Sequence, residues 1–253
     1  MIRLNTDTTV LIPVPFMGRT LDIHQDPSSL NHGLCLWDAA LCFLRYLEAN
    51  PREAEALRGA SVLELGAGTG VLGLALAHCL GCHVVCTDLP SVLPNLQANL
   101  AANPLPAGAA GAVLALDYAW DGSAPPHVLA ASRSGAGFQH IIGTDVAYSE
   151  TLNATLLATA AAFAGALPPA HGRAVVTLVN ELRCEVAQAV FDRVAPQLFK
   201  VHRVPAKRLH PDFRGSTFIM ARMTLKRGGR VEAEAGGGAG GGGGGREGDS
   251  AEE

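Results

Sequence analysis

A short glycine-rich loop is the part of the sequence with the clearest chemical meaning. The apolar run at residues 62–65 predicts a buried strand, and Gly66, Gly68 and Gly70 follow it at every second position. Residues 71–80 then have the apolar pattern of a buried helix. Glycine lets a ligand come close to the backbone because it has no Cβ, and the N–H groups that begin a helix favour negative charge. Strand, glycine loop and helix in this order predict a site for a nucleotide-type cofactor.

Two classes of cofactor fit this loop, and a ligand-free turn is a third interpretation. Gly68, Gly70 and Gly73 match the dinucleotide fingerprint, with Asp88 at the expected distance for a ribose contact. The same loop also begins with Glu64, an acidic residue inside the strand, followed by alternating glycines. A carboxylate there suits the cationic amino-acid end of S-adenosylmethionine, which has no phosphate, and Asp88 suits its ribose hydroxyls. We favour S-adenosylmethionine.

Polar residues follow the other predicted strands at the same end. They are Asp88 after the second strand, residues 117–120 after the third, 144–148 after the fourth and 180–183 after the fifth. In sheets of this kind, ligands bind beyond the carboxyl ends of the strands. The sequence therefore predicts one site at this edge.

The strands and helices that must position these residues alternate along the chain. This pattern predicts an α/β, Rossmann-like fold: a seven-stranded, mostly parallel sheet with an antiparallel edge and helices on both faces. Strands are expected at residues 62–65, 83–87, 112–116, 140–143, 174–180, 199–204 and 217–223. Helices are expected at residues 36–49, 71–80, 91–102, 150–167 and 185–195, with Pro51 marking the end of the first and residues 121–137 forming a loop or short irregular helix.

Three segments follow from this organisation. Two short strands, at residues 9–15 and 20–23, give an N-terminal β extension at residues 1–32. The main domain spans residues 33–226. Residues 227–253 are rich in glycine and acidic residues, and we expect this tail to be disordered because it cannot bury apolar surface.

The composition of the chain limits the partners and the compartment that we expect for it. The net charge of −4 offers no basic face for a phosphate backbone, so we expect no nucleic acid. Residues 151–170 carry no charge, but Asn153, Gly165 and Pro168 favour a buried helix over a membrane span. The six cysteines, with no visible signal sequence, predict a reduced compartment, the cytoplasm or also the nucleus. The cluster at residues 78–83 lacks a second ligand pair, so we expect no metal site, and we expect a monomer.

The motifs together resemble the class I S-adenosylmethionine-dependent methyltransferases. More narrowly, they are similar to methyltransferase family 16, the seven-strand protein-lysine methyltransferases. The similarity runs from about Gly33 to Met223, and rests on residues 37–40, 62–70 and 87–88 and on Asp145-x-x-Tyr148. The last motif marks the lysine methyltransferase branch.

The resemblance implies S-adenosylmethionine as cofactor and a lysine side chain of a non-histone protein as acceptor. Asp145 and Tyr148 are the expected catalytic residues: they would shape the lysine entrance, with Asp145 holding and orienting the amine. The expected cofactor contacts are Trp37, Glu64, Gly66, Ala67, Gly68, Gly70, Asp88 and Thr144. Either Tyr118 or Trp120 would pack on the adenine.

The sequence departs from the family pattern at two places. Tyr118 stands where the family has tryptophan, and Gln139 stands where it often has aspartate. Separately from these departures, three alternatives remain: methylation of a small amine, a nicotinamide-dependent oxidoreductase, and an inactive methyltransferase that serves as a binding partner. Against the oxidoreductase, no tyrosine is followed four residues later by lysine.

Several of these residues also have purely structural interpretations. Trp37 could be a core residue, Asp88 could cap the following helix, and Tyr148 could be an ordinary packed tyrosine. Glu181 and Arg183 could simply pair with each other in the loop after the fifth strand.

Overall fold

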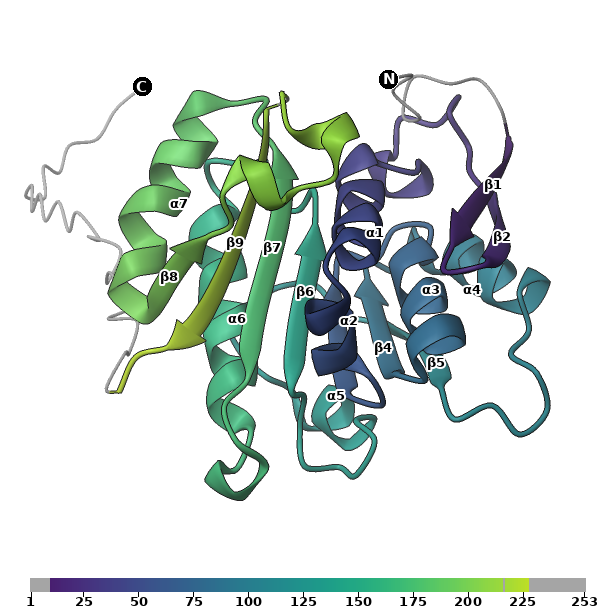
Figure 1. The fold of residues 1–253 in the computed structure, drawn as a ribbon. Coiled ribbons are helices and arrows are strands. Elements are labelled where there is room, and N and C mark those ends of the chain that lie inside the picture. The colour runs from purple at the N-terminus through teal and green to yellow at the C-terminus, as the bar shows by residue number, and fades with distance from the viewer. Residues whose placement is uncertain (1–9, 216, 228–253) are drawn as a thin grey trace, which may run out of the picture.

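A seven-stranded sheet forms the centre of the computed structural model, which describes residues 10–215 and 217–227 (Figure 1). The strand order is β5-β4-β3-β6-β7-β9-β8. The strands are β3 (Ser61–Leu65), β4 (His83–Asp88), β5 (Ala112–Asp117), β6 (His140–Thr144), β7 (Val175–Glu181), β8 (Phe199–Arg203) and β9 (Phe218–Leu225). The first five in this order are parallel, and β9 is antiparallel to both neighbours. The predicted fold class is confirmed.

Helices cover both faces of the sheet (Figure 1). They are α1 (Asp38–Ala49), α2 (Pro51–Leu57), α3 (Val71–Leu80), α4 (Leu93–Ala102), α5 (Pro126–Ala130), α6 (Asn153–Ala166) and α7 (Glu185–Leu198). Side chains of α1 to α4 join one hydrophobic core and those of α5 to α7 join another. Along β3, Val62 belongs to the first core and Leu63 to the second, because successive side chains of a strand point to opposite faces.

Several helical segments differ from the expectation. Pro51 begins α2 as well as ending α1, since proline is accommodated at the first position of a helix. Helix α7 continues past Pro196 to Leu198, which is buried in the core. Short 3₁₀ helices also form at His32–Leu34, Pro169–His171, Ala206–Arg208 and Pro211–Phe213. Among the residues described, none of the helices has both the length and the apolar character that a membrane crossing needs.

An N-terminal hairpin, β1 (Leu11–Phe16) and β2 (Arg19–His24), packs beside α3 and α4. Asn99 of α4 accepts a hydrogen bond from the His24 N–H (2.8 Å) and donates to the His24 carbonyl (2.9 Å). Its amide also donates to the carbonyl of Thr69, in the glycine loop (2.9 Å). Asn103 makes the same pair of bonds with the backbone of Asp22. The two amide side chains thus bond the backbone of β2 as a neighbouring strand would. Asn99 also links the hairpin to the glycine loop. The predicted tail lies, except for residue 227, outside the described residues.

The Asn99→Ala variant should lower the free energy of unfolding by about 3 kcal/mol, because it leaves the buried Thr69 carbonyl and two part-buried backbone groups of His24 without partners. Asn103→Ala is the matched control: its bonds to Asp22 are exposed to water, so the loss should stay below about 1 kcal/mol. Urea unfolding monitored by circular dichroism measures both. Equal losses in the two variants would contradict a special role for Asn99.

Candidate active site

The glycine loop after β3 packs against residues that follow two other strands. Gly66, Gly68 and Gly70 have positive φ angles of 66°, 55° and 78°. A Cβ on Gly66 would lie 2.7 Å from a methyl carbon of Val146 and 3.2 Å from the ring of Trp120. Only glycine fits there, because both the backbone conformation and the space exclude a side chain. Ala67 is buried, and its N–H donates to the carbonyl of Thr87 (3.0 Å).

Asp88 joins the glycine loop to the end of β4. One carboxylate oxygen accepts from the Gly68 N–H (2.7 Å) and the other from the Leu89 N–H (2.8 Å). Burial raises the pKa of Asp88, and these two backbone bonds oppose that shift. Helix α4 begins only at Leu93, so Asp88 does not cap it. Each carboxylate oxygen can accept a further hydrogen bond, which leaves capacity for the hydroxyls of a ligand.

Glu64 is placed differently from the sequence-based expectation. Its side chain is buried beneath α3, where Oε2 accepts from the Gly73 N–H (3.0 Å) and from the Cys86 thiol (3.2 Å). A Cβ on Gly73 would lie 2.3 Å from the Cys86 sulfur, so this contact needs a glycine. Burial raises the pKa of Glu64 to about 8, which keeps it protonated at neutral pH. A neutral, buried acid holds the helix that follows the loop through the Gly73 N–H.

The structure distinguishes between the two aromatic residues after β5. Tyr118 points into the core: its ring packs edge-to-face against Phe163 (5.8 Å between centroids), and its hydroxyl lies 2.9 Å from an Asp121 oxygen. It is only 7% exposed. Trp120 is half-buried and borders the glycine loop at Gly66. Trp120 is therefore the aromatic side chain in place to contact a ligand on that loop.

Asp145 follows Thr144 at the end of β6 and is held from three sides. Its φ is 60°, an unusual left-handed conformation that aspartate tolerates better than most residues. Its N–H donates to the Val179 carbonyl (2.7 Å), and one carboxylate oxygen accepts from the Glu181 N–H (3.2 Å). The other oxygen lies 2.7 Å from the guanidinium of Arg183. Burial raises the pKa of Asp145, and the charge of Arg183 opposes that shift.

Tyr148 lies at the surface near Asp88 and Asp145. It is 51% exposed, so it is not an ordinary packed tyrosine. Partial burial raises its pKa, and the charges of Asp88 and Asp145 raise it further. Asn180 holds the loop between Asp145 and Tyr148 by accepting a hydrogen bond from the Ala147 N–H (2.8 Å). The phenol therefore stays neutral at the edge of the site.

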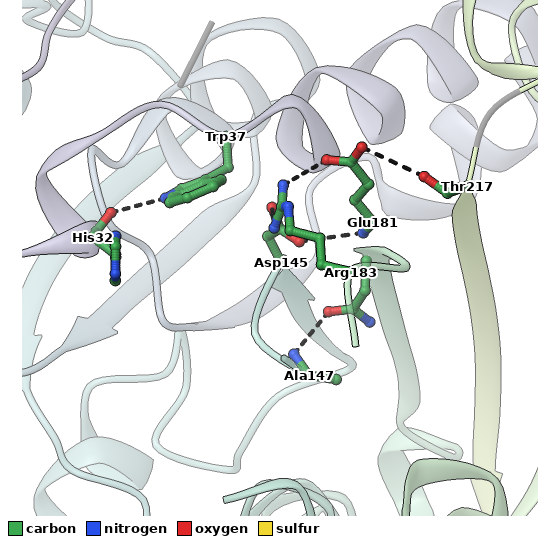
Figure 2. A network of polar contacts seen from close by, with 8 residues as sticks. His32, Trp37, Asp145, Ala147, Glu181, Arg183 and Thr217 are labelled. Atoms are coloured by element: carbon green, nitrogen blue, oxygen red, sulfur yellow. Dashed lines mark hydrogen bonds and ion pairs between the residues drawn. The ribbon is translucent and has the colours of Figure 1, made fainter. Parts of the chain in front are cut away.

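Trp37 precedes α1 and lies beside Arg183, which pairs with Asp145 and Glu181 (Figure 2). It is half-buried, and its indole N–H donates to the His32 carbonyl (2.8 Å). The guanidinium of Arg183 stacks on its ring, 4.5 Å from the centroid. Trp37 is thus a wall of the site and not a core residue.

Sequence reasoning missed the part that Arg183 plays. Glu181 and Arg183 do pair, at 2.7 Å, but Arg183 also joins Asp145 and Trp37 (Figure 2). The pattern Glu-x-Arg at the end of a core strand is visible in the sequence, whereas the contact of Arg183 with Asp145, which follows β6, is not. In the part of the chain that the structure describes, no three or more His, Cys, Asp or Glu side chains gather as a metal ion would require.

The raised pKa of Glu64 makes stability depend on pH. The unfolded chain releases this proton near pH 4.5 and the folded protein near pH 8. Between these values the folded state binds more protons, so stability should fall by up to about 1.4 kcal/mol per pH unit as pH rises. The Glu64→Gln variant, which cannot ionise, should lose this component.

Urea unfolding at pH 5.5 and pH 8 checks this prediction. The quantity to compare is the difference in the free energy of unfolding between the wild-type protein and the variant. His140 is present in both proteins, so its own lowered pKa cancels in that difference. A difference that stays constant with pH would show that Glu64 is not protonated in the folded state.

Solved structures with the same fold are methyltransferases. A methyltransferase from Pyrococcus furiosus superposes with a TM-score of 0.52 over 81% of this chain and 88% of that one, at 18% identity. SMU.776, crystallised with SAH, gives a TM-score of 0.52 over 87% of this chain and 57% of its own, at 10% identity. At these identities the likeness establishes the fold alone.

Sequence comparison is more specific. Mouse EEF1A lysine methyltransferase 3 is 35% identical over 73% of this chain and 72% of its own length. Mouse protein N-lysine methyltransferase METTL21A is 32% identical over 77% of this chain and 83% of its own. The sequence model of the lysine methyltransferase family matches residues 16–168, which include the glycine loop, Asp88 and the Asp145-x-x-Tyr148 motif. This chain belongs to the lysine methyltransferase family.

Proposed function

We propose that this protein transfers a methyl group from S-adenosylmethionine to a lysine side chain of a non-histone protein. One observation carries the proposal beyond family membership. Val146, between Asp145 and Tyr148, packs directly against Gly66 of the glycine loop. The predicted cofactor loop and the predicted acceptor loop are therefore in contact, as transfer of one carbon between two bound molecules requires.

The residues of the loop fit this cofactor. Asp88 keeps acceptor capacity for the ribose hydroxyls, the turn has no side chain at Gly66, and the indole ring of Trp120 lies beside it. We assign the adenine contact to Trp120, since Tyr118 is packed in the core. When bound, the cofactor supplies a methyl group on a sulfonium, which is already an excellent leaving group.

The protein must then align the acceptor and allow it to lose a proton. Alignment alone can account for roughly 7–11 kcal/mol of a reaction barrier. A lysine ammonium has a pKa of about 10.4 in water, and a partly desolvated site beside another cation lowers it. Asp145 attracts the ammonium on arrival and orients the nitrogen lone pair afterwards. Tyr148 packs on the lysine stem, and water takes the proton.

The cellular compartment is also part of the proposal. All six cysteines are free thiols, which suits a reducing compartment such as the cytoplasm. We expect the protein to act as a monomer.

Radiolabelled methyl transfer tests the proposal directly. The protein is incubated with methyl-labelled S-adenosylmethionine and a cell extract, and also with purified EEF1A, the substrate that the name of one mouse relative specifies. We expect label in a protein band that yields methyl-lysine on hydrolysis. Label only in small molecules would support small-amine methylation instead, and retained cofactor with no labelled product would refute catalysis.

Removing Asp88 should weaken cofactor binding. We expect Asp88→Ala to raise the dissociation constant for S-adenosylhomocysteine by about 30-fold, the effect of losing hydrogen bonds to a charged acceptor. Calorimetry measures it. Asp22→Ala, a loss of the same charge at an exposed position of β2, is the control and should bind normally. Unchanged affinity in Asp88→Ala would contradict the ribose contact.

Removing the charge of Asp145 should affect the acceptor and not the cofactor. Asparagine keeps the shape and tolerates the left-handed backbone, so Asp145→Asn should fold. We expect methyl transfer to fall by at least about 100-fold, as is typical when a group that stabilises charge is lost. Affinity for S-adenosylhomocysteine should stay within about twofold of the wild-type value. Asp192→Asn, at an exposed ion pair, is the control. Parallel losses of cofactor affinity and activity would disprove an acceptor role for Asp145.

A further inference from the structure

The guanidinium of Arg183 occupies a cage made by one indole ring and two carboxylates (Figure 2). Its central carbon lies 4.5 Å from the centre of the Trp37 ring. One terminal nitrogen is 2.7 Å from Asp145 Oδ2, and the other is 2.7 Å from Glu181 Oε2. We call Trp37, Asp145 and Glu181 the cation cage. Its members come from the start of α1 and from the ends of β6 and β7.

The chemistry of the cage selects for an organic cation in general. An aromatic face attracts cations, and a carboxylate binds either an ammonium or a guanidinium. A lysine side chain arrives as such a cation, since it is protonated in water. The cage therefore offers an acceptor lysine interactions of the same kind, a carboxylate and an aromatic ring, although an ammonium lacks the two-armed geometry of Arg183.

Arg183 also closes the way to Asp145. The Asp145 side chain is 3% exposed, whereas that of Arg183 is 29% exposed and lies on the solvent side. One Asp145 oxygen accepts from the Glu181 N–H, and the other faces the guanidinium. Two cations at one carboxylate repel each other. An ammonium can thus reach Asp145 only after Arg183 has moved.

We propose that Arg183 is an internal stand-in for the acceptor's ammonium: it fills the cation cage while the acceptor is absent, and acceptor binding displaces it into solvent. The identity of the displacing group rests on the proposed function. The incoming ammonium replaces the charge of Arg183 beside Asp145, which avoids leaving this buried carboxylate without a cation. Arginine is a suitable occupant because it stays protonated in proteins and offers no lone pair to a methyl donor.

The exchange can be measured without methyl transfer, using n-butylammonium as an analogue of the lysine side chain. The full-length protein, saturated with S-adenosylhomocysteine, is labelled with ¹⁵N-tryptophan and titrated with this ion. It contains two tryptophans, so the indole signal of Trp37 is assigned with Trp37→Phe. We expect Arg183→Gln to bind n-butylammonium about tenfold more tightly than the wild-type protein. The gain should vanish when Asp145→Asn is added.

Two controls separate displacement from general charge effects. Arg203→Gln removes the same charge at an exposed ion pair with Asp192 and should bind n-butylammonium like the wild-type protein. Neutral n-butanol should shift the Trp37 signal equally in all variants. Affinity for n-butylammonium that is unchanged or weaker in Arg183→Gln would show that Arg183 is a fixed part of the site, and would overturn the proposal.

Arg183→Lys covers the case in which Arg183→Gln does not fold. Lysine keeps the charge but cannot bridge both carboxylates and stack on the indole together. It should compete less well, so n-butylammonium should bind about threefold more tightly, and no gain would count against displacement. Because this readout needs no methyl transfer, it is separate from the proposed function. Failure to find methyl-lysine would refute the function alone, whereas unchanged binding of n-butylammonium would refute the exchange alone.

Discussion

The missing side chain at residue 66 is the constraint on which the rest of the site depends. The turn after β3 passes between Trp120, which follows β5, and Val146, which follows β6. A Cβ at this position would lie 2.7 Å from Val146, so any other residue would push the loops apart. Their contact brings the predicted cofactor loop, held by Asp88, beside the loop that carries Asp145 and Tyr148. Transfer between two bound molecules depends on that proximity.

Two of the buried acids at the site, Glu64 and Asp145, are stabilised in different ways. Glu64 lies under α3 with only an amide and a thiol as donors, so burial raises its pKa and it keeps its proton. Asp145 lies near the rim, where the long side chain of Arg183 reaches it. The protonated Glu64 in the core stabilises the fold by holding α3. An ion pair at the rim can be exchanged, because another cation can enter from solvent.

Much of the fold could be predicted because its signals are local. Apolar runs of four to seven residues mark the parallel strands without reference to distant residues, and alternating glycines mark the turn after β3. Helix α2 was not foreseen, because Pro51 is equally compatible with the end of one helix and the start of another. The extension of α7 past Pro196 depends on the burial of Leu198, which is a property of the packed structure.

For the site, the sequence by itself determined which residues stand at the strand ends: the glycine loop, Asp88, and Asp145 with Tyr148. Parallel strands end at one edge, so their order in the chain was enough. Only the tertiary structure decided that Trp120 and not Tyr118 borders the loop, that Glu64 points beneath α3, and that Arg183 covers Asp145. The strand period already placed Glu64 on the face of Val62, but which helix covers that face is not local information. The direction of a side chain and its partner on another strand follow from packing, and spacing along the chain does not encode them.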